Sequence, residues 1–188
     1  MKKINSLFLA ILLSGSFFLY SCENNNQEGE TEEVSEMEAE STERVSPLRT
    51  AQGTVAGTEI KVQYGAPSVK DRVIWGDIAP YNEVWRTGAN EATNVEFADD
   101  VMVEGKALAA GRYSLFTIPK ESGPWTVIFN SDWDLEHGHY QYKEENDVLR
   151  VDVNPVKDQE HQEQLAISVE EPGIVIRWEK LKLPIEIK

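Results

Sequence analysis

After Pro47 the sequence consists of short runs in which apolar and polar residues alternate, and Gly, Pro, Asn or Asp separates the runs. In the run TEIKVQY, for example, Ile60, Val62 and Tyr64 fall on one side of an extended chain and the polar residues on the other. Successive side chains of a strand point to opposite faces of a sheet, so this alternation is typical of a strand with one buried face. The pattern continues to the C-terminus and predicts an all-β fold.

The alternation predicts about nine or ten strands. Gly57 and the pair Glu104-Gly105 lie between runs and predict hairpin turns, and Pro184 marks an edge strand because proline cannot donate a ladder hydrogen bond. So many short strands predict an antiparallel β-sandwich, with a jelly roll as one form of it and a closed β-barrel as the alternative. The expected strands are residues 52–56, 58–64, 93–97, 101–103, 112–118, 124–130, 148–153, 164–169, 173–179 and 181–187.

The N-terminus predicts an exported lipoprotein. The sequence begins MKK, continues with an apolar stretch over residues 4–20, and reaches Ser21 and Cys22, which is the order of a signal peptide over residues 1–21. Its end, LYSC, resembles the lipobox of bacterial lipoproteins. The resemblance implies a lipid such as palmitate on Cys22 and a membrane anchor in the bacterial envelope, at the outer membrane on its periplasmic or cell-surface side. The alternative is cleavage by an ordinary signal peptidase, which would release a soluble periplasmic protein.

Acidic charge separates a polar segment from a domain. Residues 22–46 contain nine glutamates and one arginine, a net charge of −8, and predict a disordered tether, with a helix over residues 31–43 as the alternative. Residues 47–188, the expected single all-β domain, carry 24 acidic and 15 basic side chains, a net charge of −9. Nucleic acids are bound through clustered Lys and Arg, so this balance argues against a nucleic-acid partner. Cys22 is the only cysteine, so no internal disulfide is expected.

Two long stretches, residues 65–91 and 131–147, lack strand character. Loops of this length in compact domains usually have a function. In the first stretch, Arg86 could bind a carboxylate or phosphate, with Asn90 and Glu91 beside it. The alternative is that Arg86 and Glu91 pair with each other and fix the loop to the sandwich. The candidate ligand-binding residues are Arg72, Trp75, Tyr81, Trp85, Arg86, Asn90 and Glu91.

The aromatic residues of this stretch have two interpretations. Trp75, Tyr81 and Trp85 could form a platform on which a sugar ring stacks, because aromatic faces supply a large apolar contact area. The same spacing suits rings that fill the end of a sandwich. A carbohydrate or another small molecule is therefore the expected ligand of a pocket in this loop.

The second stretch contains His137 and His139, which would point to the same face of an extended chain. With Asp134 or Glu136 they could bind a metal, but a closed zinc site needs about four ligands and an open one about three. Surface histidines are therefore the favoured interpretation. The sequence contains no cofactor fingerprint, nucleophile elbow or calcium loop.

Five segments resemble those of one known family: VWRTGANEAT at residues 84–93, Gly-Lys at 105–106, GRYSLFTIP at 111–119, WTVIFN at 125–130 and DVLRV at 147–151. On these motifs the chain resembles the domain of unknown function 2911 family from Ser46 to the C-terminus. The resemblance implies an exported, all-β family rich in lipoproteins and without an established activity. The chain departs from the family pattern between Asn130 and Tyr142, where a glycine-containing turn is common.

Three functional hypotheses follow. The first is a non-catalytic binding or interaction module whose ligand lies against residues 65–91. The second is a hydrolase or a metal-dependent enzyme that uses Arg86 with Glu91, or His137 with His139. The third is a purely structural surface protein.

Overall fold

The structure is a computed structural model that describes residues 44–188. These residues belong to one compact unit, Ser41–Lys188. The predicted signal peptide, Cys22 and nearly all of the acidic segment lie outside the described residues. Within residues 44–188 there is no helix long and apolar enough to cross a membrane.

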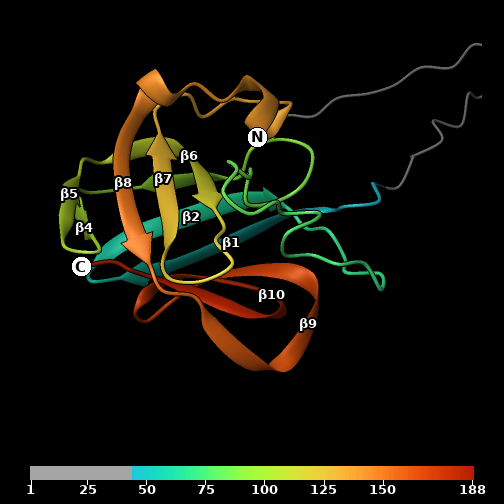
Figure 1. Cartoon of the computed structure of the whole chain (residues 1–188). Coiled ribbons are helices and arrows are strands. Elements are labelled where there is room, and N and C mark those ends of the chain that lie inside the picture. Colours follow the sequence, from blue (N-terminus) through green and yellow to red (C-terminus); the bar gives the residue numbers. More distant parts are fainter. Residues whose placement is uncertain (1–43) are drawn as a thin grey trace, which may run out of the picture. The chain divides into compact units, whose positions relative to one another are not determined.

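The described chain is an all-β structure of three antiparallel sheets (Figure 1). A six-stranded sheet has the order β1-β2-β3-β6-β7-β8, and the pairs β9-β10 and β4-β5 form two further sheets. The strands are β1 (Leu48–Val55), β2 (Thr58–Gly65), β3 (Asn94–Phe97), β4 (Val101–Val103), β5 (Lys106–Leu108), β6 (Gly111–Ile118), β7 (Trp125–Asn130), β8 (Asp147–Val153), β9 (Val156–Glu170) and β10 (Gly173–Glu186).

The β9-β10 hairpin forms the second layer of a sandwich and packs against the six-stranded sheet, as the orange and red ribbons of Figure 1 show. The layers approach closely at Gly53 of β1, where an added Cβ would lie 2.9 Å from the carbonyl oxygen of Val169. Each fully buried aliphatic or aromatic side chain of this core contributes roughly 1.5–3 kcal/mol to stability. The buried core includes Ile60, Val62, Phe97, Leu115, Val127 and Phe129 from the large sheet and Leu165, Ile174, Trp178, Leu183 and Ile185 from the hairpin.

The predicted antiparallel β-sandwich is confirmed. The large sheet is open, with β1 and β8 at its edges, so the barrel alternative is not realised. The six strands of this sheet lie side by side in the order in which they follow one another along the chain. This is the arrangement of a meander, whereas a jelly roll contains two Greek keys.

The last strands differ most from the prediction. The two strands expected over residues 173–179 and 181–187 form a single strand, β10, in which Glu179 has a φ of 56° and the register shifts on both sides of it. A bulge of this kind bends a strand without ending it. Its partner β9 is 15 residues long, although only residues 164–169 were expected to be a strand.

The outer face of the large sheet is covered by the two long loops. Phe116 of β6 and Ile128 of β7 point to this face and form a second, smaller buried cluster with Ala92 and Leu135. Strands β6 and β7 are therefore buried on both faces, which explains why WTVIFN lacks a polar face. The segments 66–93 and 131–146, the second of which includes the short 3-10 helices η1 (Gly138–Gln141) and η2 (Glu144–Asn146), thus contribute side chains to the folded core.

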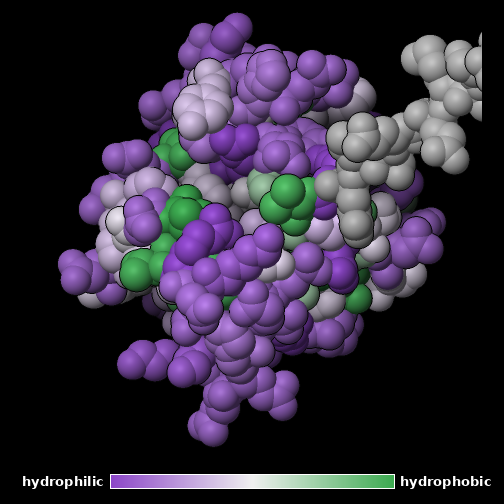
Figure 2. All heavy atoms as spheres, turned by 90° about the vertical axis from the view of Figure 1, so that its right-hand side faces the viewer, coloured by the Kyte–Doolittle hydropathy of each residue, from purple (hydrophilic) through white to green (hydrophobic). Residues whose placement is uncertain are grey.

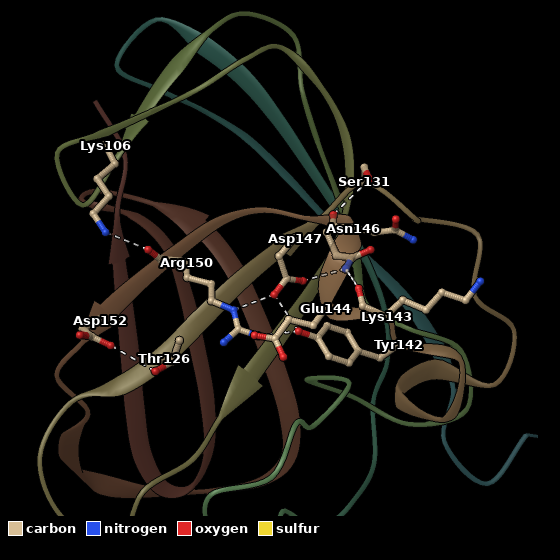
Figure 3. A network of polar contacts seen from close by, with 11 residues as sticks. Lys106, Thr126, Ser131, Tyr142, Lys143, Glu144, Asn146, Asp147, Arg150 and Asp152 are labelled. Atoms are coloured by element: carbon tan, nitrogen blue, oxygen red, sulfur yellow. Dashed lines mark hydrogen bonds and ion pairs between the residues drawn. The ribbon is translucent and has the colours of Figure 1, made fainter.

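A polar network fixes the loop before β8 (Figure 3). The carboxylate of Asp147 accepts hydrogen bonds from Asn130 Nδ2 (2.8 Å), Tyr142 Oη (2.7 Å) and Arg150 Nε (2.7 Å). Burial and the hydrogen bond to Asp147 raise the pKa of Tyr142 to about 12, so this hydroxyl remains a donor. The network connects β7, the 142–147 segment and β8.

We expect Asp147→Asn to lower the free energy of unfolding by about 2 kcal/mol. The NH2 group of the new asparagine would face one of the three groups that donate hydrogen bonds to the carboxylate, and that group would lose its acceptor. Chemical denaturation would measure the change. Glu144→Gln is the matched control, since Glu144 lies 3.3 Å from the same Arg150 but its side chain is 75% exposed, and exposed pairs contribute little. Equal effects of the two changes would contradict the assigned role of Asp147.

Candidate functional site

Trp85, the first candidate in the VWRTGANEAT segment, is part of the core. Its ring stacks on Trp178 at 5.7 Å between centroids, and Trp75 meets both rings edge-on at 5.8 Å. Trp125 completes the cluster, 4.8 Å from Trp75. Trp85 is 3% exposed, so of its two interpretations the structure favours the one in which it fills the end of the sandwich.

The residues that follow Trp85 form a tightly constrained turn. Thr87 is fully buried with a φ of 55°, an uncommon conformation for a β-branched residue. Its carbonyl oxygen accepts a hydrogen bond from Thr93 Oγ1 at 2.9 Å. A Cβ at Gly88 would lie 2.8 Å from Thr93 Oγ1 and 3.0 Å from the carbonyl oxygen of Gly65. The turn therefore holds Arg86 in one place relative to the sheet.

The guanidinium of Arg86 is fixed by four contacts. Its Nε donates to Nδ1 of His139 at 3.0 Å, and its Nη1 donates to the carbonyl oxygen of Asn90. Tyr140 places its ring 5.2 Å from the guanidinium carbon. Gly138 lies so close that a Cβ there would be 2.7 Å from Cδ of Arg86. Burial lowers the pKa of Arg86 from its ordinary value, against the opposing influence of Glu91, yet an arginine remains charged in proteins.

Arg86 lines a pocket of about 550 Å³, which we call the Arg86 pocket. Its wall consists of Ile78 and residues of the segments 45–46, 67–72, 85–90 and 139–140. Three of the lining residues, Lys70, Arg72 and Arg86, carry a full positive charge, and no Asp or Glu of the described chain lines it. In a domain with a net charge of −9, this is a local reversal of sign.

Glu91, which follows the lining residue Asn90, is engaged by a group outside the pocket lining. Glu91 forms an ion pair with Arg44, with 2.5 Å between Arg44 Nη2 and Glu91 Oε2. Burial alone would raise the pKa of Glu91, but the hydrogen bond from Arg44 and the charges of Arg44 and Arg86 lower it below its ordinary value. The alternative expectation, a direct pair between Arg86 and Glu91, is not what the structure shows, because Arg44 takes the carboxylate.

Four of the eight non-glycine residues with positive φ in the described chain lie at or beside the same pocket. Lys70 and Asn90, which line it, and Asp71 and Thr87, next to lining residues, all have φ between 47° and 65°. Left-handed non-glycine residues cost of order 1–3 kcal/mol each and cluster at functional sites. The strain therefore supports the assignment of this pocket as the candidate site.

The remaining candidates lie elsewhere. Trp75 and Tyr81 line a second hollow of about 300 Å³, with Lys120, Trp125 and Lys157. Six of the seven predicted candidates are therefore divided between two places: Arg72, Trp85, Arg86 and Asn90 at the first pocket, and Trp75 and Tyr81 at the second. Glu91 lines neither pocket.

His137 and His139 differ in how far they are buried. His139 is half-buried beside Arg86, whereas His137 is exposed. Over the part of the chain that the structure describes, no group of three or more His, Cys, Asp or Glu residues is placed to hold a metal ion. Because Nδ1 of His139 accepts the hydrogen bond from Arg86, the ring proton resides on Nε2.

We expect His139 to make stability depend on pH. Burial and the positive charge of Arg86 lower its pKa from the ordinary value of about 6.5. The unfolded chain then binds a proton more readily than the folded chain, so stability is present above about pH 6.5 and is lost as the pH falls through the folded pKa. Thermal unfolding from about pH 7.5 to about pH 5 should show a larger loss in the wild type than in His139→Gln. Parallel profiles would contradict the prediction.

Comparison with known proteins identifies a family. The family described as "Protein of unknown function (DUF2911)" matches residues 46–187, nearly all of the described structure. No curated protein and no solved structure matches the chain. The match includes the VWRTGANEAT segment, which supplies part of the wall of the Arg86 pocket, and the chain belongs to the DUF2911 family of proteins of unknown function.

Proposed function

We propose that this protein is a non-catalytic binding module of the bacterial envelope that recognises a small anionic ligand in the Arg86 pocket. The observation that carries the proposal is the set of three positively charged side chains around one hollow with no carboxylate among its described lining residues. Arginine binds carboxylates and phosphates through paired, charge-assisted hydrogen bonds. The volume of about 550 Å³ lies within the usual range for small-molecule sites.

The face shown in Figure 2 favours a small ligand over a large apolar partner. On the face shown in Figure 2, hydrophilic residues predominate and the apolar ones form small separate groups. Extended apolar patches are the usual mark of a protein or membrane docking surface.

A thermal-shift screen of the purified protein against phosphate esters, carboxylic acids, neutral sugars and divalent metals tests the proposal. A ligand that binds only the folded state at a hundredfold excess over its Kd stabilises by about 2.7 kcal/mol. We expect shifts with anions, their loss in Arg86→Ala, and their retention in Lys61→Ala, which removes a positive charge from the exposed face of β2. Shifts with neutral sugars alone would favour a carbohydrate module, and a shift with metals alone would favour a metal-dependent activity.

Arg86→Ala needs a folding control, because its side chain also contacts His139, Asn90 and Tyr140. A melting temperature near that of the wild type, together with lost binding, assigns Arg86 to the ligand. A collapse of the fold would instead assign it to the structure, and Arg86→Lys, which keeps the charge but not the planar fork, would then separate the two roles.

The envelope location is a separate part of the proposal. It depends on the signal peptide and on Cys22, and it predicts that cells incorporate labelled palmitate into the wild-type protein and not into Cys22→Ala. Equal labelling of both proteins would contradict lipidation at this cysteine.

A further inference from the structure

The two arginines of the Arg86 pocket are held in the same way. Nε and Nη2 of Arg72 donate to the carbonyl oxygens of Val69 (3.1 Å) and Ser68 (2.6 Å). Nε and Nη1 of Arg86 donate to His139 and to the carbonyl oxygen of Asn90. Each guanidinium is thus fixed through two of its nitrogens, and the third, Nη1 of Arg72 or Nη2 of Arg86, has no acceptor within residues 44–188. Two donors are therefore oriented before any ligand arrives, which lowers the entropic cost of binding.

The positive charge of the pocket is not balanced by acidic residues in its lining. Lys70, Arg72 and Arg86 line it, and the nearby carboxylate of Glu163 already accepts a hydrogen bond from the backbone N–H of Lys70 (2.9 Å) and lies 3.2 Å from His161. Glu91 is paired with Arg44. Three like charges around one hollow repel one another, and a ligand with two negative charges offsets this repulsion better than a ligand with one.

The pocket is also larger than an inorganic anion requires. Its volume of about 550 Å³ leaves room for an organic body beside the charged group. Ser46 and Ser68 offer hydroxyl groups and Ile78 and Tyr140 offer apolar surface in the lining. Hydroxyl-rich rings present both kinds of surface, with polar edges and apolar faces.

We infer that the Arg86 pocket takes an organic phosphate monoester of sugar size, whose doubly charged phosphate is bound by both Arg72 and Arg86. This inference rests on the proposed function and names its ligand class. It assigns to Arg72 the role of a second charge-recognising residue.

Calorimetric titration of the full-length protein in a non-ionic detergent tests the inference with four probes: glucose 6-phosphate, gluconate, glucose and inorganic phosphate. At about pH 8 the phosphate monoester carries two negative charges, because its second pKa is near 6. We expect glucose 6-phosphate to bind at least about tenfold more tightly than gluconate, an open-chain sugar acid of similar size with one charge, and than inorganic phosphate, which has no organic body. Glucose should not bind measurably.

Variants of Arg72 and Arg86 test whether these residues produce the preference for glucose 6-phosphate. Arg72→Ala and Arg86→Ala should each weaken binding of glucose 6-phosphate at least about tenfold, and Arg72→Ala should also remove its preference over gluconate. Lys61→Ala should leave affinity and preference within about twofold of the wild type. Because Arg72 caps its own loop, Arg72→Lys provides a variant that keeps the charge, and melting temperatures check that each variant is folded.

The outcomes separate the inference from the proposed function. If no anion binds, both fail. If anions bind but gluconate or inorganic phosphate binds as tightly as glucose 6-phosphate, the anion-binding function stands and the ligand class is wrong. If a folded Arg72→Ala keeps the full preference for the phosphate ester, recognition by two arginines is wrong.

Discussion

Replacing Gly65 with alanine is expected to lower the free energy of unfolding by about 3 kcal/mol or more. Gly65 ends β2, and its carbonyl oxygen accepts a hydrogen bond from the N–H of Ala89 at 3.2 Å. A methyl group at this position would fall far inside van der Waals contact with the carbonyl oxygen of Ala89. That atom belongs to the backbone of the constrained turn, so relief requires a shift of the turn, and with it of Arg86.

Chemical denaturation of Gly65→Ala measures the effect, and Gly123→Ala is the matched control. Gly123 has a φ of 80° and open space around the position of a Cβ. Alanine there costs only the strain of its backbone conformation, about 1 kcal/mol. If Gly65→Ala is no more destabilising than Gly123→Ala, the close packing of β2 against the turn is not a major contribution to stability.

Trp85→Ala is expected to destabilise the domain by about 3–5 kcal/mol. The substitution empties the space beside Trp75 and Trp178, and each of these two rings loses its aromatic contact with Trp85. It also removes the side chain that anchors the VWRTGANEAT segment in the core. The loss would appear as a lower midpoint of unfolding and a weakened near-ultraviolet circular dichroism signal.

The control for this substitution is Trp133→Ala. Trp133 is 38% exposed and stacks on the guanidinium of Arg112 at 4.0 Å. Its removal leaves no buried cavity, so we expect a loss of about 1 kcal/mol. A stable Trp85→Ala variant that fails to bind anions would contradict a purely structural role and would return Trp85 to the ligand site.

The sequence predicted the strands whose side chains alternate between the core and solvent. Ile60 and Val62 of β2 and Leu149 and Val151 of β8 follow this rule, because one face of each strand is buried. The first half of β9 does not follow it, since KDQEHQ is polar on both faces and its strand conformation comes from pairing with β10. Likewise, local pattern could not reveal that β10 passes through Glu179 without ending.

The site was predictable only in part, because a sequence pattern does not say which distant segments meet. Arg86 and Asn90 were identified from the residue types in one motif, and Arg72 from its loop. Lys70 and Tyr140 were missed, since nothing in their local sequence distinguishes them from other surface residues. His139 was considered as a metal ligand, whereas the structure places it as a hydrogen-bond acceptor that orients Arg86.

The contact between the first strand and the β9-β10 hairpin has a kinetic consequence. Arg49 of β1 donates a hydrogen bond to Gln164 of β9, 115 positions later in the chain. Sandwiches with such high contact order fold in milliseconds to seconds, because loop-closure entropy is lost before the distant contacts form. The Arg86 pocket is assembled from segments that span most of the same distance. No residue of β9 or β10 lines the pocket, but the backbone N–H groups of Val69 and Lys70 beside it donate hydrogen bonds to Glu163 of β9. We therefore expect ligand binding to require a docked C-terminal hairpin.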